Sequence, residues 1–169
     1  TITRVIIPSS VLSIEDSAFR GCSLIKQIIL PHSLKYIRSK AFLKCNSLIE
    51  ISIPSSVVSI DDNAFFGCSS LKTITIPSSV EYIGKFCFYG CSSLTQISIP
   101  TSIYSIQKYT LSYCKNLTKI DIPSNVKYID EYAFSHCSSL NEISIPISGT
   151  LIHLEAFYGC SSVSKTTLI

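Results

Sequence analysis

Eight cysteines and three histidines are the residues of this 169-residue chain whose types could support catalysis or metal binding. A zinc site needs Cys and His ligands that converge at short spacings. The only short pair is Cys87 and Cys91, with no histidine nearby. The spacing therefore argues against a metal site.

Catalysis by a cysteine or serine would require a base positioned beside the nucleophile. His32, His136 and His153 fall at three different phases of a 23-residue period, so they form neither one column nor an obvious dyad. Serine is abundant because PSS and CSS segments, which are typical of turns, recur along the chain. Because no arrangement that an active site requires is present, we expect no enzymatic activity and no cofactor.

The sequence around these residues repeats with the same period of 23 residues, and this repeat predicts the elements that position them. Counted from each proline, position 3 is mostly aliphatic, position 6 is always Ile, position 11 is aromatic except at Leu111, and position 14 is Cys. The prolines are Pro8, Pro31, Pro54, Pro77, Pro100, Pro123 and Pro146, and the cysteines in step with them are Cys22, Cys45, Cys68, Cys91, Cys114, Cys137 and Cys160.

One unit cannot fold alone. It buries roughly five large apolar side chains, worth about 1.5 to 3 kcal/mol each, whereas ordering its backbone costs about 1 to 2 kcal/mol per residue. Units of this kind must therefore stack on their neighbours. We predict that residues 1–169 form a single solenoid of about seven coils. Since both ends fall inside the repeat pattern, we expect it to be part of a longer chain.

Each coil is predicted to be mainly β. In residues 71–77 (LKTITIP), Ile74 and Ile76 alternate with threonines, which is the period of a half-buried strand, and the proline ends it. Residues 77–83 (PSSVEYI) have apolar positions three apart, which indicates a bend or a short second strand. Residues 85–91 (KFCFYGC) are expected to turn the chain through a short helical or 3₁₀ turn.

The repeat L-x-x-I-x-I-P-x-x-V-x-x-I-x-x-x-A-F-x-x-C resembles the BspA-like leucine-rich repeat, the 23-residue treponemal class, over essentially the whole chain. The resemblance implies a right-handed solenoid with one parallel strand per repeat. It also implies binding of proteins or host surfaces, display on bacteria or anaerobic protists, and no catalytic motif. The chain departs from the pattern at Cys87, Thr110 and Leu111. At Gly149 and Ile169 the last coil degenerates, which suggests that a terminal cap is near.

The cysteine column allows two interpretations. Neighbouring Cα atoms in a stack would lie about 5 Å apart, within disulfide range, and a secreted protein could form such bonds. However, side chains in register point in parallel, and one cysteine per coil beside a phenylalanine suits a small apolar filler. We favour buried free thiols.

Outward positions two and four residues before each proline are the candidate binding face, because solenoids often bind through extended faces. The alternative is that small polar residues merely solvate the sheet. The candidate residues are Arg4, Ile6, Gln27, Ile29, Glu50, Ser52, Thr73, Thr75, Gln96, Ser98, Lys119, Asp121, Glu142 and Ser144.

Tyr36, Tyr82 and Tyr128 form a secondary candidate, because they alternate with serines in one column and tyrosine is enriched at interfaces. The favoured alternative is that their rings only cover outer backbone. Positions 7 to 9 mostly alternate in charge from coil to coil, and we interpret this alternation as setting the stacking register.

Composition narrows the choice of partner. Charged residues make up 15% of the chain, the net charge of +3 is spread along it, and no apolar run is long enough to cross a membrane. We therefore expect neither nucleic-acid binding nor direct membrane insertion by this segment. The sequon Asn116-Leu117-Thr118 is weak support for secretion.

The sequence thus predicts a non-catalytic module that binds a protein or glycan partner. Cell-surface or extracellular adhesion, or host interaction, is the first hypothesis. The alternative is a cytoplasmic scaffold or cytoskeleton-associated repeat protein, which free thiols would suit better.

Overall fold

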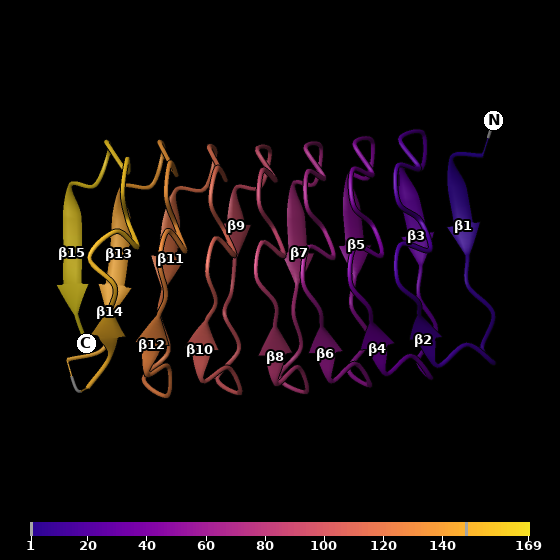
Figure 1. The fold of residues 1–169 in the computed structure, drawn as a ribbon, viewed down its shortest axis with the longest axis horizontal. Coiled ribbons are helices and arrows are strands. Elements are labelled where there is room, and N and C mark those ends of the chain that lie inside the picture. The colour runs from indigo at the N-terminus through magenta and orange to yellow at the C-terminus, as the bar shows by residue number, and fades with distance from the viewer. Residues whose placement is uncertain (1, 148) are drawn as a thin grey trace.

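The computed structural model describes residues 2–147 and 149–169 and shows a single row of stacked coils with the termini at opposite ends (Figure 1). Each coil places a strand of two to four residues on one side of the row and a two-residue strand on the other. The predicted mainly β solenoid of about seven coils is confirmed.

The odd-numbered strands form one side, called here the strand face. They are β1 (Arg4–Ile6), β3 (Gln27–Ile29), β5 (Glu50–Ser52), β7 (Thr73–Thr75), β9 (Gln96–Ile97), β11 (Lys119–Asp121), β13 (Glu142–Ile145) and β15 (Lys165–Leu168).

The even-numbered strands form the other side, called here the bend face. They are β2 (Ser13–Ile14), β4 (Tyr36–Ile37), β6 (Ser59–Ile60), β8 (Tyr82–Ile83), β10 (Ser105–Ile106), β12 (Tyr128–Ile129) and β14 (Leu151–Ile152). Every pairing is parallel, and paired residues are one repeat apart, as Ile74 and Ile97 are. Equivalent residues of successive coils therefore lie side by side in columns.

The invariant apolar positions form the core between the two faces. Ile14, Phe65, Cys68 and Ile74 are each at most 5% exposed, which confirms the predicted inward side of the coil. The phenylalanine column from Phe19 through Phe42 and Phe65 to Phe88 is a stack of nearly parallel rings, with centroids 5.2 to 5.5 Å apart. Stacking of this kind adds about 0.5 to 1.5 kcal/mol per pair beyond the area buried.

The expected helical or 3₁₀ turn is not a regular helix. In residues 62–68, which are equivalent to residues 85–91 in the next repeat, backbone N–H groups alternate between two kinds of hydrogen-bond acceptor. Those of Ala64, Phe66 and Cys68 donate to carbonyls three residues back, whereas those of Phe65 and Gly67 donate to the next coil. Because half of the donors point to a neighbouring coil, the segment cannot close the continuous ladder of a helix.

Side chains extend the bonding between coils. The Cys68 thiol donates to the Phe42 carbonyl at 3.1 Å, and the Ser79 hydroxyl donates to the Val57 carbonyl at 2.7 Å. Most equivalent cysteines repeat this bond, so the cysteine column bonds the coils as well as filling space. The second serine of the PSS segment likewise links two coils in addition to its role in a turn.

Both β-ladders are interrupted at the same place. The strand-face ladder ends at β9 and resumes at β11, and the bend-face ladder ends at β8 and resumes at β10. The phenylalanine stack also stops here, because Leu111 stands where Phe is due, and it resumes with Phe134 and Phe157. Turn-side bonds still cross this boundary, including that from the Phe88 N–H to the Thr110 carbonyl at 2.8 Å.

The cysteines in step with the repeat are buried except Cys22 and Cys160, which are half-buried, and the structure describes all eight as unpaired thiols. Burial is the main cause that raises the pKa of Cys45 and of Cys114 to about 12. A thiol whose ionised form is disfavoured in the folded state reacts slowly with alkylating reagents.

Replacing Phe65 by Ala should lower the free energy of unfolding by about 3 to 5 kcal/mol, because it removes a buried ring stacked on both sides. Urea denaturation followed by circular dichroism measures the change. Phe66→Ala, at a half-buried ring, is the matched control and should cost less. A loss below about 1 kcal/mol for Phe65→Ala would contradict the core assignment.

The thiol column should make the protein sensitive to alkali. An unfolded cysteine ionises near pH 9, whereas Cys45 and Cys114 stay protonated up to about 12. Their contribution is therefore complete below about pH 9 and declines above it, by up to roughly 1.4 kcal/mol per pH unit for each thiol.

The variant Cys45→Ala with Cys114→Ala lacks this ionisation. The difference in unfolding free energy between the parent chain and the variant should therefore shrink as the pH rises from about 8.5 to 10.5. Urea denaturation at several pH values in the presence of a reductant measures it. A difference that stays constant would show that these thiols ionise equally in both states.

Candidate functional site

All the candidate residues of the strand face lie on its outward side, which the alternation of the strands dictates. In β7, for example, Thr73 and Thr75 are exposed while Ile74 between them is buried. Ser98 is also exposed and directly follows β9. Their outward placement is as predicted, and a binding role for them remains a proposal.

One shallow depression of about 500 Å³ lies on the strand face across β3, β5 and β7. Its outward lining is polar apart from Ile29, which is 37% exposed. The side chains around it that project from the sheet or from its edge are Gln27, Ile29, His32, Glu50, Ser52, Thr73 and Thr75.

The two ends of the strand face differ in electrostatics. Toward the C-terminus charges are paired within the face: Lys119 lies 3.2 Å from Asp121, and Lys165 lies 3.8 Å from Glu142. The Ser144 hydroxyl donates to Asp121 at 2.7 Å, and with Lys119 it lowers the pKa of that carboxyl. In the depression, by contrast, Glu50 has no ion pair among the described residues.

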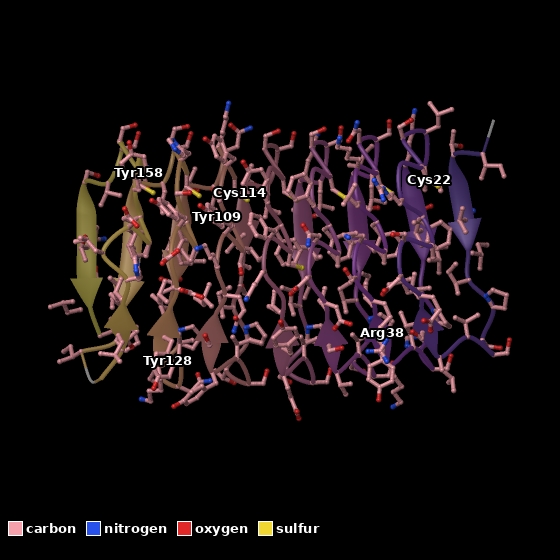
Figure 2. The ribbon with its side chains drawn as sticks, in the orientation of Figure 1. Cys22, Arg38, Tyr109, Cys114, Tyr128 and Tyr158 are labelled. Carbon is pink, nitrogen blue, oxygen red and sulfur yellow. The ribbon has the colours of Figure 1, made fainter. Side chains whose placement is uncertain are left out.

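The tyrosine column lies on the bend face, with Tyr36, Tyr82 and Tyr128 37 to 45% exposed. In Figure 2, Tyr128 and Arg38 lie at the lower edge of the view, among the even-numbered strands. The Arg38 guanidinium lies 4.3 Å from the centre of the Tyr36 ring, and the Tyr82 hydroxyl is 3.2 Å from an Asp62 oxygen.

The expected alternation of charge forms ion pairs at some of the coil boundaries. Arg38 lies 3.4 Å from Asp61, and Lys108 pairs with Glu131, which also lies 3.5 Å from His153. Exposed pairs of this kind contribute about 0 to 1 kcal/mol each. These charges therefore specify the stacking register mainly because a slip by one coil would bring like charges together.

A strip of aromatic rings on the turn side, called here the aromatic strip, was not predicted. Phe86, Tyr109 and Tyr132 stack at centroid distances of 4.7 and 5.0 Å, and Tyr113 stacks on His136 at 4.5 Å. The strip crosses the boundary at which both ladders stop. Its members are Phe66, Phe86, Tyr89, Tyr109, Tyr113, Tyr132, His136 and Tyr158.

One signal in the sequence could have revealed this strip. In the last five repeats, one of the two positions 12 and 13 after the proline carries a ring: Phe66, Tyr89 and Tyr158 precede a glycine, whereas Tyr113 and His136 follow a serine. In the structure, five residues of the strip have positive φ, between 56° and 59°, where bulky side chains are unusual; they are Phe86, Tyr109, Tyr113, Tyr132 and His136. Such backbone costs about 1 to 3 kcal/mol per residue, which ring stacking partly offsets.

The three histidines, which were the candidate bases, lie in different parts of the structure. His32 lies at the depression of the strand face, His136 in the aromatic strip and His153 beside Glu131. Within residues 2–147 and 149–169, no group of three or more His, Cys, Asp or Glu side chains has the arrangement of a metal site. The same residues include no helix long and apolar enough to span a membrane.

Solved structures share this fold. A leucine-rich repeat protein of T. pallidum matches with a TM-score of 0.83 and 28% identity, over 95% of this chain and 78% of that one. A leucine-rich repeat protein from Bacteroides ovatus matches with a TM-score of 0.58 and 26% identity, over 96% and 62%. A leucine rich cell surface protein from Faecalibacterium prausnitzii matches with a TM-score of 0.71 and 24% identity, over 98% and 59%.

The chain thus spans less than two thirds of the B. ovatus and F. prausnitzii proteins. No curated protein sequence matches it. The family model of the BspA type leucine rich repeat region matches residues 1–88 and 36–164, with six copies. Together with the 23-residue register of the strands, this match shows that the chain belongs to the BspA type leucine-rich repeat family.

Proposed function

We propose that the chain is a non-catalytic binding module that presents its strand face to a protein or glycan partner, in adhesion or host interaction at the cell surface. The observation that carries the proposal is the depression across β3, β5 and β7. There the exposed Ile29 and Glu50, which has no ion pair among the described residues, lie among hydroxyl groups on a parallel sheet.

The chemistry of this depression suits recognition of a partner. Ser52, Thr73 and Thr75 offer hydroxyls that both donate and accept hydrogen bonds, as does the amide of Gln27. Glu50 can pair with a cation of the partner, because no cation of this chain neutralises it among the described residues. Ile29 and Ile6, which are 37% and 64% exposed, add an apolar corner.

Two observations bear on whether the protein is at the cell surface or in the cytoplasm. The F. prausnitzii relative is named a cell surface protein, and at 24% identity that likeness carries the fold alone. The free buried thiols suit a reducing compartment, which keeps the cytoplasmic scaffold as the second candidate. Protease shaving of intact cells that make the protein distinguishes the two locations. Loss of the protein from intact cells supports the surface, whereas protection until lysis supports the cytoplasm.

Ile29→Arg and Thr75→Arg should each weaken binding of the purified protein to immobilised host-cell proteins or to a glycan array by at least about tenfold, because each places a long charged side chain across the depression. Both sites are exposed, so the fold should persist, as circular dichroism can verify. Ser138→Arg, at an exposed turn position, is the matched control and should bind like the parent chain.

Equal binding by all three variants would refute the strand face as the site. Absence of binding by the parent chain to every host protein and glycan tested would count against the adhesion proposal and favour the intracellular alternative.

A further inference from the structure

Two neighbouring coils of the array are separated on the bend face. They are coil 4 (residues 77–99) and coil 5 (residues 100–122), each counted from its proline. Neither β-ladder crosses the boundary between them. Figure 1 shows a wider step from β8 to β10 than between the other neighbouring even-numbered strands, whereas the turns along the upper edge are evenly spaced. The two coils are therefore farther apart on the bend face than on the turn side.

Backbone hydrogen bonds show the same separation. At each other boundary among the described residues, two N–H groups on the bend face donate to the preceding coil, as that of Gly84 does to the Ile60 carbonyl at 2.9 Å. The equivalent donors of coil 5 are the N–H groups of Tyr104 and Gln107, and in the part of the chain that the structure describes neither donates to coil 4. Opening this boundary further would therefore break no backbone hydrogen bond of this kind.

The turn side of the same boundary keeps its bonds. The N–H groups of Phe86, Phe88 and Gly90 donate to carbonyls of coil 5 at 2.8 to 3.1 Å, and the Phe86 ring stacks on Tyr109 at 4.7 Å. The apolar core also continues across the boundary, and apolar contact is not directional, so it tolerates a change of angle. The turn side can therefore act as a pivot.

The packing beside the boundary explains the separation. Position 10 after the proline is Ala in the other five coils, but it is Cys87 in coil 4 and Thr110 in coil 5, and both are buried. Larger side chains in a close-packed column push the neighbouring backbone apart. The Thr110 hydroxyl donates to the Gln107 carbonyl at 2.7 Å and also lies 3.3 Å from the Gly84 carbonyl. A side chain thus spans the boundary where the backbone bonds are missing.

Charge favours separation at the same place. Lys85 and Lys108 occupy equivalent positions of coils 4 and 5, so like charges meet across the boundary. Within the described residues no salt bridge joins these two coils, and Lys108 pairs instead with Glu131 of coil 6. On its other side coil 4 is bound to coil 3, because Asp62 accepts the Tyr82 hydroxyl at 3.2 Å and the Lys85 backbone N–H at 2.8 Å. Each coil is therefore tied more firmly to its outer neighbour.

We propose that this boundary is a hinge. The coils up to residue 99 and those from residue 100 move as two rigid segments, which open and close on the bend face about the bonded turn side. The motion changes the angle between the two parts of the strand face, one with the depression across β3, β5 and β7 and the other with the paired charges of β11 to β15. A partner that contacts both parts selects one hinge angle. The hinge belongs to the array itself and does not rest on the proposed function.

Pulsed electron paramagnetic resonance between two spin labels tests the hinge. Labels attached to p-acetylphenylalanine leave the eight cysteines unmodified. One pair replaces Lys35 and Tyr104, which are exposed at position 4 of coils 2 and 5 and lie on opposite sides of the boundary. The matched control pair replaces Leu12 and Glu81, which are exposed at the same position of coils 1 and 4. Both pairs span the same number of coils, but the control pair lies within one segment.

The distance distribution of the pair at Lys35 and Tyr104 should be at least about twice as wide as that of the pair at Leu12 and Glu81. Only a hinge broadens the first distribution selectively, because a fixed kink shifts its mean without widening it. Equal widths for the two pairs would overturn the proposal.

The triple variant Cys87→Ala, Thr110→Ala and Leu111→Phe gives coils 4 and 5 the residues that the other coils carry at positions 10 and 11. The coils can then approach and form the missing bonds. The distribution across the boundary should narrow to that of the control pair, and hydrogen exchange of the Gln107 amide should slow by at least about tenfold. The Gly84 amide, which is already bonded to coil 3, is the internal control and should not change.

A wide distribution and fast Gln107 exchange in the folded triple variant would refute packing at Cys87 and Thr110 as the origin of the hinge. Should the triple variant fail to fold, the two label pairs in the otherwise unaltered chain still decide whether the boundary bends.

Discussion

Bonding between equivalent positions of successive coils is the interaction on which the whole structure depends. A coil of 23 residues has no core of its own, so its strands, its turn and its small polar side chains all bond to the next coil. This requirement explains why the core positions repeat so strictly. The thiol of Cys68 and the hydroxyl of Ser79 each reach a carbonyl of the preceding coil, so even these small residues are fixed by their neighbours. Residues that face outward are free of the constraint, and the candidate surfaces lie there.

The boundary between β9 and β11 shows what happens when one part of this bonding is missing. Both β-ladders stop there and the phenylalanine stack loses a ring at Leu111. The aromatic strip continues across the same boundary, with Phe86 stacked on Tyr109 at 4.7 Å. Five of its eight residues have unfavourable positive-φ backbone, and ring stacking offsets part of that cost. The turn side therefore holds the coils together where the strands bond least.

Much of the architecture could be predicted from the sequence because the same spacing of apolar core positions recurs in seven repeats. The strands, the second short strand, the buried Phe65 and Cys68 and the outward threonines of β7 all follow from period and alternation. The expected helical or 3₁₀ turn is a turn with bonds to carbonyls three residues back, but it is not a helix, because alternate N–H groups such as that of Phe65 bond to the next coil. The aromatic strip was missed because its rings come from three positions of the repeat, as Phe86, Tyr89 and Tyr113 do, and none of these positions is aromatic in all seven repeats. The depression with the unpaired Glu50 depends on which neighbouring charges pair across coils, and that requires coordinates.

Amide hydrogen exchange of the turn segment tests most directly whether the coils are held by their neighbours. The N–H groups of Asn63, Phe65 and Gly67 donate to carbonyls of the next coil at 2.7 to 2.9 Å. We predict that these amides exchange as slowly as that of Ile74 in β7, because opening them requires separating two coils. Exchange at the rate of an exposed turn, with the strand amides still protected, would contradict it and show that the turn side is only loosely attached to the stack.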